Sequence, residues 1–169
     1  MNAEIAHKLL LPSCLALFPA RFDSLPARAM MLAVALQESD FIHRQQLVGA
    51  FRNWWESITG PATSFWQFEL IGVRGVMEHH TTGPMLRSVC EMLGYPFDAK
   101  VLHKAMTYDM LLGVIMARLA LYRHPQPLPG RDDPQAGWKQ YIDIWRPGKP
   151  HPDKWAACFA EAWRVVDKG

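Results

Sequence analysis

One carboxyl group in the sequence, that of Glu38, has a setting that favours acid chemistry. It lies near the end of a predicted helix from Ser24 to Ser39, one turn beyond Val34 and Ala35, so it extends an apolar row. Burial and the negative end of the helix dipole both disfavour a charged carboxylate there, so we expect a raised pKa. Such an acid can protonate the leaving oxygen of a glycosidic bond near neutral pH. The position also fits the solvated end of a helix, where Glu38 would be an ordinary surface acid.

Other residue types that often carry chemistry are not arranged for it. The cysteines Cys14, Cys90 and Cys158 are far apart within apolar segments, which fits neither a disulfide framework nor a zinc site. We expect them to be buried free thiols. The adjacent pair His79 and His80 lacks the spacing of a helical metal motif. The sequence therefore predicts no metal site and no cofactor.

The bulk composition predicts one globular domain over residues 1–169. Hydrophobic residues make up 50% of the chain and charged residues 20%, a ratio typical of folded proteins. The net charge of +2 comes without a basic block, so nucleic acid is not an expected partner. Residues 9–20 imitate a signal peptide, but Glu4 and Pro12 argue against one, and no apolar run is long enough for a membrane span.

Capping residues, prolines and glycines divide the sequence into helices and predict an all-α fold. The helix over 109–122 is apolar almost all round and is expected to form the buried centre. Residues 42–60 show no sustained hydrophobic periodicity, which predicts a long surface loop. No segment of the chain alternates between apolar and polar residues as a strand would. The expected helices are one ending near Phe18 and those over about 24–39, 72–79, 84–93, 98–106, 109–122, 138–145 and the C-terminal segment.

Two segments resemble motifs of the lytic transglycosylases, relatives of goose-type lysozymes. Ala33 to Phe41 (AVALQESDF) is similar to their Glu-Ser-x-Phe signature, and Gly60 to Gln67 (GPATSFWQ) is similar to an Ala-x-Gly-Leu-Met-Gln turn along the sugar cleft. The resemblance implies a lysozyme-like helical domain with a glycan cleft. In it Glu38 is the acid and base, Ser39 supports it, and Phe65, Trp66 and Gln67 lie along the groove. Ser64 stands where the family usually has glycine, which puts the left-handed turn in question.

A third family motif, an Ala-Tyr-Asn-x-Gly run after a buried helix, has a loose counterpart in Tyr141 to Gly148 (YIDIWRPG). The resemblance places Tyr141 at the substrate. Trp54, Trp55 and Trp66 flank the presumed cleft loop and are expected to contact sugar, because aromatic faces stack on pyranose rings. Arg118, among apolar neighbours in the central helix, is expected to form a structural ion pair with an acid.

The resemblance implies cleavage of peptidoglycan glycan strands between N-acetylmuramic acid and N-acetylglucosamine, with attack by the muramoyl 6-hydroxyl and a 1,6-anhydro product. Hydrolysis would need a second carboxylate, and Asp40 points to a different side of the helix. Glu69 could reach the cleft, but it fits a solvated loop acid better, because glutamate is so often exposed.

Two other classes stay open: a noncatalytic virion component that contacts virion proteins, and a glycan-binding module. We expect a phage or prophage product without a signal peptide. It would remain in the bacterial cytoplasm before release, or travel with the virion, and act on the cell wall in the periplasm.

Overall fold

The structure is a computed structural model, and it describes residues 1–47 and 59–168. The N-terminal segment is one helical run of three pieces: α1 (Ala3–Ile5), a π-helical stretch (Ala6–Leu10) and α2 (Leu11–Leu15). Asn2 begins the run, because its side chain accepts a hydrogen bond from the amide of Ile5. Because Pro12 has no amide hydrogen, it cannot donate to the carbonyl four residues earlier. The wider π-helical turns lie at that place, just before Pro12. The run ends at Leu15, before the predicted boundary near Phe18.

The helix that carries Glu38, α3 (Leu25–Ser39), forms where the sequence predicts it. Ser24 caps its N-terminus by accepting a 3.3 Å hydrogen bond from the amide of Ala27. The helix is buried between α7 and α9, and it ends because Asp40 adopts the left-handed conformation, with φ of 50°. Glu38 therefore lies in the last turn, where the backbone carbonyls lack partners within the helix.

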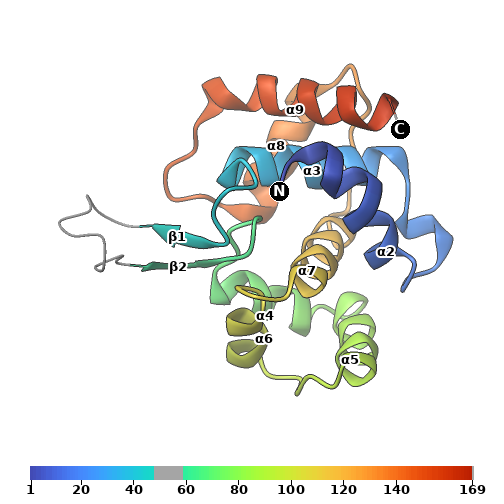
Figure 1. Cartoon of the computed structure of the whole chain (residues 1–169), viewed down its shortest axis with the longest axis vertical. Coiled ribbons are helices and arrows are strands. Elements are labelled where there is room, and N and C mark those ends of the chain that lie inside the picture. Colours follow the sequence, from blue (N-terminus) through green and yellow to red (C-terminus); the bar gives the residue numbers. More distant parts are fainter. Residues whose placement is uncertain (48–58, 169) are drawn as a thin grey trace.

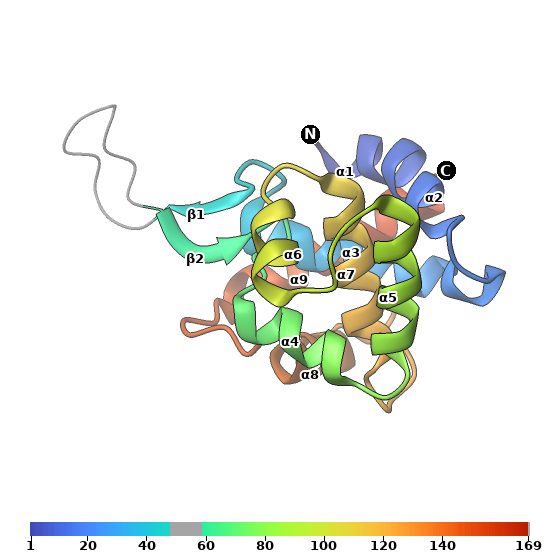
Figure 2. The same ribbon diagram turned by 90° about the horizontal axis from the view of Figure 1, so that it is seen from below.

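A two-stranded antiparallel sheet follows α3 and projects from the helical body (Figure 1, Figure 2). In it β1 (Gln45–Leu47) pairs with β2 (Thr59–Thr63). The prediction that no strand forms was wrong. The two strands are short, they come from either side of residues 48–58, and β2 contains Gly60 and Pro61, so no alternating pattern marks them in the sequence. Trp54 and Trp55 lie outside the described residues.

Three helices surround one end of α7: α4 (Leu70–Glu78), α5 (Thr82–Leu93) and α6 (Ala99–Ala105) (Figure 1). Gly94 ends α5 with φ of 74°, a conformation that favours glycine. Asp98 begins α6 by accepting hydrogen bonds from the amides of Lys100 and Val101. Both boundaries agree with the prediction.

The central helix, α7 (Met110–Tyr122), is buried from Leu112 through Leu121, as the sequence predicts. Arg118 lies in this buried part, but the predicted ion pair with an acid was wrong. Its Nε donates a 2.7 Å hydrogen bond to the carbonyl of Phe22, and its guanidinium lies over the rings of Phe22 and Tyr122. A carbonyl dipole and two aromatic faces therefore take the place that an acid was expected to fill.

Two helices complete the fold, α8 (Pro134–Trp145) and α9 (Pro152–Asp167), and α9 lies along α3 (Figure 1). α8 begins earlier than predicted because Asp133 caps it, with Pro134 in its first turn. The described chain is thus mostly helical, which agrees with the all-α class at that coarse level. Within residues 1–47 and 59–168, no helix combines the length and apolarity that a membrane crossing requires.

Candidate active site

Glu38 is half-buried, and its carboxyl group contacts a side chain from α8. Tyr141 Oη donates a hydrogen bond of 2.6 Å to Glu38 Oε1. Burial is the main cause that raises the pKa of Glu38, and the charge of Glu69 adds to it, whereas the tyrosine hydrogen bond and the charge of Lys154 oppose it. The net direction is upward. Glu38 therefore keeps its proton to a higher pH than an ordinary glutamate and can act as an acid.

Tyr141 is held in place by aromatic side chains of α8 and α9. Its ring stacks on Trp155, with centroids 5.2 Å apart and an interplanar angle of 14°, and contacts Trp138 at 5.3 Å. Burial and the negative charge of Glu38 both raise the pKa of the phenol. The hydroxyl group therefore remains neutral and stays a donor to Glu38. The motif resemblance placed Tyr141 at the substrate, and the structure brings it into contact with Glu38.

The turn after β2 is tied to the end of α3 through Ser39. The Ser39 hydroxyl donates a 2.8 Å hydrogen bond to the carbonyl of Phe65. Thr63 and Phe68 close the turn with two backbone hydrogen bonds of 2.8 and 2.9 Å. Ser64 has a φ of 66°, so the turn is left-handed although serine stands where the resembled family has glycine. The departure at Ser64 thus leaves the turn intact.

The three residues predicted to line the groove differ in exposure. Gln67 is half-buried, and its Nε2 donates to the carbonyls of Ser64 at 2.8 Å and His43 at 3.2 Å. Phe65 is only 5% exposed and Trp66 is 0% exposed, with the Trp66 indole N–H donating to the carbonyl of Met31 at 2.8 Å. Neither ring presents a face to solvent, which disagrees with the expectation that both line the groove. An indole whose N–H is satisfied by a carbonyl can be buried completely, and both rings pack against Phe41, just after α3.

Lys154, in the first turn of α9, is a site residue that sequence reasoning missed. Its Nζ donates to the carbonyl oxygens of Leu36 at 2.6 Å and Gln37 at 3.1 Å, and to Asp40 Oδ2 at 2.9 Å. In the sequence, a lysine at the start of an amphipathic helix has the signature of a solvated surface residue. Only the packing of α9 against α3 reveals its contacts.

Asp40 and Glu69, the two acids considered for a hydrolytic reaction, differ in their ionic partners. Asp40 is paired with Lys154 at 2.9 Å. Glu69 is exposed at the N-cap of α4, and its charge acts on Glu38. Of the two acids considered for a hydrolytic reaction, Asp40 is therefore the one that already has an ionic partner.

The described residues offer little for metal or thiol chemistry. Among them, no group of three or more histidine, cysteine, aspartate or glutamate side chains is arranged to hold a metal ion. Cys14, Cys90 and Cys158 are free and buried. Burial raises the pKa of the Cys14 thiol to about 12, so this thiol stays protonated and unreactive at neutral pH.

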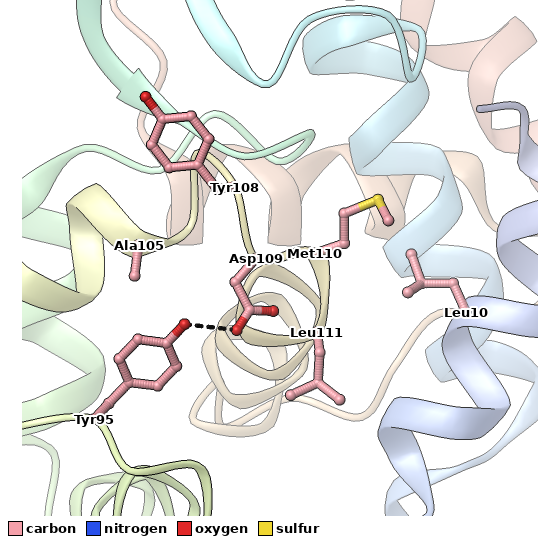
Figure 3. A pocket seen from close by; sticks show the side chains of 7 residues that line it. All are labelled: Leu10, Tyr95, Ala105, Tyr108, Asp109, Met110 and Leu111. Atoms are coloured by element: carbon pink, nitrogen blue, oxygen red, sulfur yellow. Dashed lines mark hydrogen bonds between the residues drawn. The ribbon is translucent and has the colours of Figure 1, made fainter.

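Two surface pockets lie away from Glu38. The larger, about 610 Å³, opens between the N-terminal segment and the start of α7 (Figure 3). Its Asp109 carboxylate accepts a 2.8 Å hydrogen bond from Tyr95 and also caps α7, so this polar pair has a structural role. The second, about 450 Å³, lies between α4 and α6. The glycan cleft expected beside Glu38 is neither of these and stays a prediction. The larger pocket is lined by Leu10, Tyr95, Ala105, Tyr108, Asp109, Met110 and Leu111.

Comparisons of the chain with protein-family models, curated proteins and solved structures find no match. We therefore infer function from the geometry around Glu38 and from the segments that meet there.

Proposed function

We propose that this chain cleaves the glycan strands of peptidoglycan, between N-acetylmuramic acid and N-acetylglucosamine, on a lysozyme-like scaffold with Glu38 as acid and base. One observation carries the proposal: the half-buried carboxyl group at the end of α3 accepts a 2.6 Å hydrogen bond from Tyr141. The two motifs that resemble those of lytic transglycosylases, and the loose counterpart of a third, also meet at this point. Glu38 and Ser39 come from the first, the Phe65 carbonyl from the second and Tyr141 from the third.

In the first step Glu38 donates its proton to the glycosidic oxygen. The bond between that oxygen and the anomeric carbon of N-acetylmuramic acid breaks, and the N-acetylglucosamine part leaves as an alcohol. The raised pKa of Glu38 serves this step, because more of the enzyme carries the proton near neutral pH.

In the second step Glu38 is a carboxylate and acts as the base. It accepts the proton of the muramoyl 6-hydroxyl while that oxygen bonds to the anomeric carbon, which gives the 1,6-anhydro product and restores the acid. The phenol of Tyr141 still donates to the carboxylate and keeps it oriented. Ser39 contributes by holding the turn against α3 through the carbonyl of Phe65, and Gln67 contributes by closing the turn itself through the carbonyl of Ser64.

Hydrolysis is the second candidate, with Glu69 as the second carboxylate. The charge of Glu69 acts on Glu38, so the two carboxyl groups belong to one electrostatic environment. A glycosidase that uses water places its two carboxyl groups about 5 to 9.5 Å apart across the scissile bond. In this version Glu69 would act on water or on the anomeric carbon, and the product would carry a reducing end.

Digestion of purified sacculi tests the proposal. Wild type, Glu38→Gln and Glu69→Gln are incubated with the same sacculi, and the released muropeptides are identified by mass spectrometry. We expect anhydro-muropeptides from the wild type and from Glu69→Gln, and none from Glu38→Gln. Reducing ends that disappear in Glu69→Gln would instead establish hydrolysis.

The noncatalytic alternatives have a separate readout in the same experiment. If wild type and Glu38→Gln sediment equally with sacculi and neither releases products, the enzymatic proposal fails and a glycan-binding or virion role takes its place. If both release equal amounts of product, Glu38 is not the acid.

A further inference from the structure

The last turn of α3 is fastened to the first turn of α9 by hydrogen bonds in both directions. Lys154 Nζ donates to the carbonyls of Leu36 and Gln37, which lie just before Glu38 in the chain. In return, Gln37 Nε2 donates to the carbonyl of His151 at 3.0 Å. The carbonyls at the end of a helix carry partial negative charge, and an ammonium group there offsets it.

We propose that Lys154 is a positioning residue for Glu38: its ammonium group holds the C-terminal turn of α3 in place and supplies positive charge beside the carboxyl group. The inference deepens the proposed function, and its catalytic meaning rests on that function. The physical coupling between Lys154 and Glu38 can be measured independently of any activity.

The charged and titratable groups around Glu38 come from several elements. Tyr141 on α8 donates a hydrogen bond to it, Glu69 at the start of α4 adds negative charge, and Asp40 follows it in the chain. On α9, Cys158 interacts with both Tyr141 and Lys154 and is a neutral thiol, since burial raises its pKa. Of these groups Lys154 is the positively charged one.

A single residue that serves first as acid and then as base needs a pKa near the working pH. Burial raises the pKa of Glu38, and a rise without opposition would leave a poor base for the second step. The charge of Lys154 limits the rise, because a nearby cation favours the carboxylate. Loss of this charge is therefore expected to raise the pKa of Glu38 further.

The test is a direct titration of Glu38 in the full-length protein. Glutamate labelled with ¹³C at the carboxyl carbon is incorporated, and the Glu38 signal is assigned by its absence in Glu38→Gln. Lys154→Met keeps the length of the aliphatic chain and removes the charge, whereas Lys154→Arg keeps the charge. We expect the midpoint of Glu38 to move to higher pH in Lys154→Met and to stay close to the wild-type midpoint in Lys154→Arg.

Asp40→Asn separates charge from loosening of the helix end. It removes the salt bridge with Lys154 but leaves the carbonyl acceptors of Leu36 and Gln37, and asparagine tolerates the left-handed conformation at this position. We expect no upward shift of the Glu38 midpoint in this variant. An equal upward shift in Asp40→Asn and Lys154→Met would assign the effect to loosening and overturn the charge part of the inference.

Activity provides the second readout. In Lys154→Met, the alkaline limb of the pH profile of muropeptide release is expected to move upward with the NMR midpoint, and Lys154→Arg is expected to restore it. An unchanged Glu38 midpoint in a folded Lys154→Met protein would overturn the inference, even if the wild type cleaves sacculi. A shifted midpoint in a protein that releases nothing would overturn the proposed function and leave the coupling in place.

Discussion

The helices α3 and α7 are both largely buried, and each carries an ionisable side chain whose pKa is shifted by burial. On α3 this residue is Glu38, in the last turn, where Tyr141 donates to its carboxyl group. On α7 it is Arg118, in the middle, where the Phe22 carbonyl accepts from Nε and two rings cover the guanidinium. Burial disfavours the charged form of both groups, yet their charge states near neutral pH differ.

The difference lies in the protonation state that each site allows near neutral pH. Burial lowers the pKa of Arg118 to about 10, so the guanidinium remains charged under ordinary conditions. Burial raises the pKa of Glu38 from its ordinary value of 4.5, toward the range in which a proton is readily given and taken back. A buried ionisable group is thus a candidate for catalysis when its charge state can change near the working pH, and a structural element when its charge state is constant there.

The largest effect is expected from Glu38→Gln, which removes the proton but keeps the shape. If Glu38 is the general acid, cleavage of sacculi falls by about 10²–10⁴-fold. The matched control is Glu91→Gln, an exposed glutamate on α5, which should leave the rate unchanged. A loss below tenfold in Glu38→Gln would place Glu38 in the same structural category as Arg118.

The same variant is expected to gain stability at neutral pH. The folded protein holds the Glu38 proton to a higher pH than the unfolded chain, so wild-type stability falls as the pH rises above 4.5 and levels off above the folded-state pKa. Glutamine has no charge to bury. We therefore expect Glu38→Gln to be more stable than the wild type at pH 7 by about 0.5–2 kcal/mol, the usual range for a stabilising single substitution. Urea unfolding at pH 4 and pH 7 measures this, and a gain of equal size at both values would contradict the assignment to charge.

Arg118→Ala probes the other side of the comparison. It leaves a cavity in α7, removes the packing of the guanidinium on two rings and leaves the carbonyl of Phe22 without its donor. We expect a loss of about 2–4 kcal/mol in the free energy of unfolding. Cleavage activity per folded molecule should not change.

An exposed arginine supplies the control for Arg118. Arg164→Ala on α9 removes surface ion pairs with Glu161 and Glu4, so its cost should be much smaller than that of Arg118→Ala. If Arg118→Ala costs no more than Arg164→Ala in urea unfolding, the buried contacts of Arg118 contribute little to stability.

Tyr141→Phe tests how far the setting of Glu38 depends on its hydroxyl partner. The ring and its stacking on Trp155 are kept, and only the hydrogen bond to Glu38 is lost. Because that hydrogen bond opposes the rise in the pKa of Glu38, its loss should move the alkaline limb of the activity profile to higher pH. The rate at the optimum should fall about tenfold, as for loss of a hydrogen bond to a charged group. An unchanged profile would show that Tyr141 acts through packing.

The boundaries that local chemistry sets could be predicted from the sequence. Ser24, Asp98 and Asp109 each accept from an amide of their own first turn, and Gly94 takes the left-handed conformation next to α5. The raised pKa of Glu38 was predicted in the same way, because position 38 extends an apolar row of its own helix. Each of these inferences depends on residues within a few positions of one another.

Features that depend on distant residues could not be predicted in this way. Lys154 contacts carbonyls that lie 118 and 117 positions earlier in the chain. The residues next to Trp66 in the sequence do not indicate whether its ring is exposed or buried. Its burial depends on the Met31 carbonyl, 35 positions away. The contact of Tyr141 with Glu38 was approached only through a motif resemblance, since no local pattern links two residues 103 positions apart.

The smallest effect is expected at Ser64, which lies between the end of α3 and the central helix α7. Its turn meets α3 through the hydrogen bond of Ser39, and its Cβ is 3.2 Å from the place where a side-chain carbon on Gly113 of α7 would stand. Ser64→Gly relieves a left-handed residue, which for L-amino acids costs about 1–2 kcal/mol. It also removes the 3.2 Å hydrogen bond that the hydroxyl accepts from the amide of Trp66 and gives the unfolded chain more freedom.

These opposing contributions to the effect of Ser64→Gly nearly cancel, so the free energy of unfolding should change by less than about 1 kcal/mol. Urea unfolding measures the change, and digestion of sacculi should proceed at the wild-type rate because the turn keeps its hand. A loss above roughly 2 kcal/mol would mean that Ser64 joins α7 to the turn through its side chain, beyond what an ordinary hydrogen bond contributes. In that case α7 and the Glu38 region would form one coupled unit and could not be treated as two separate regions.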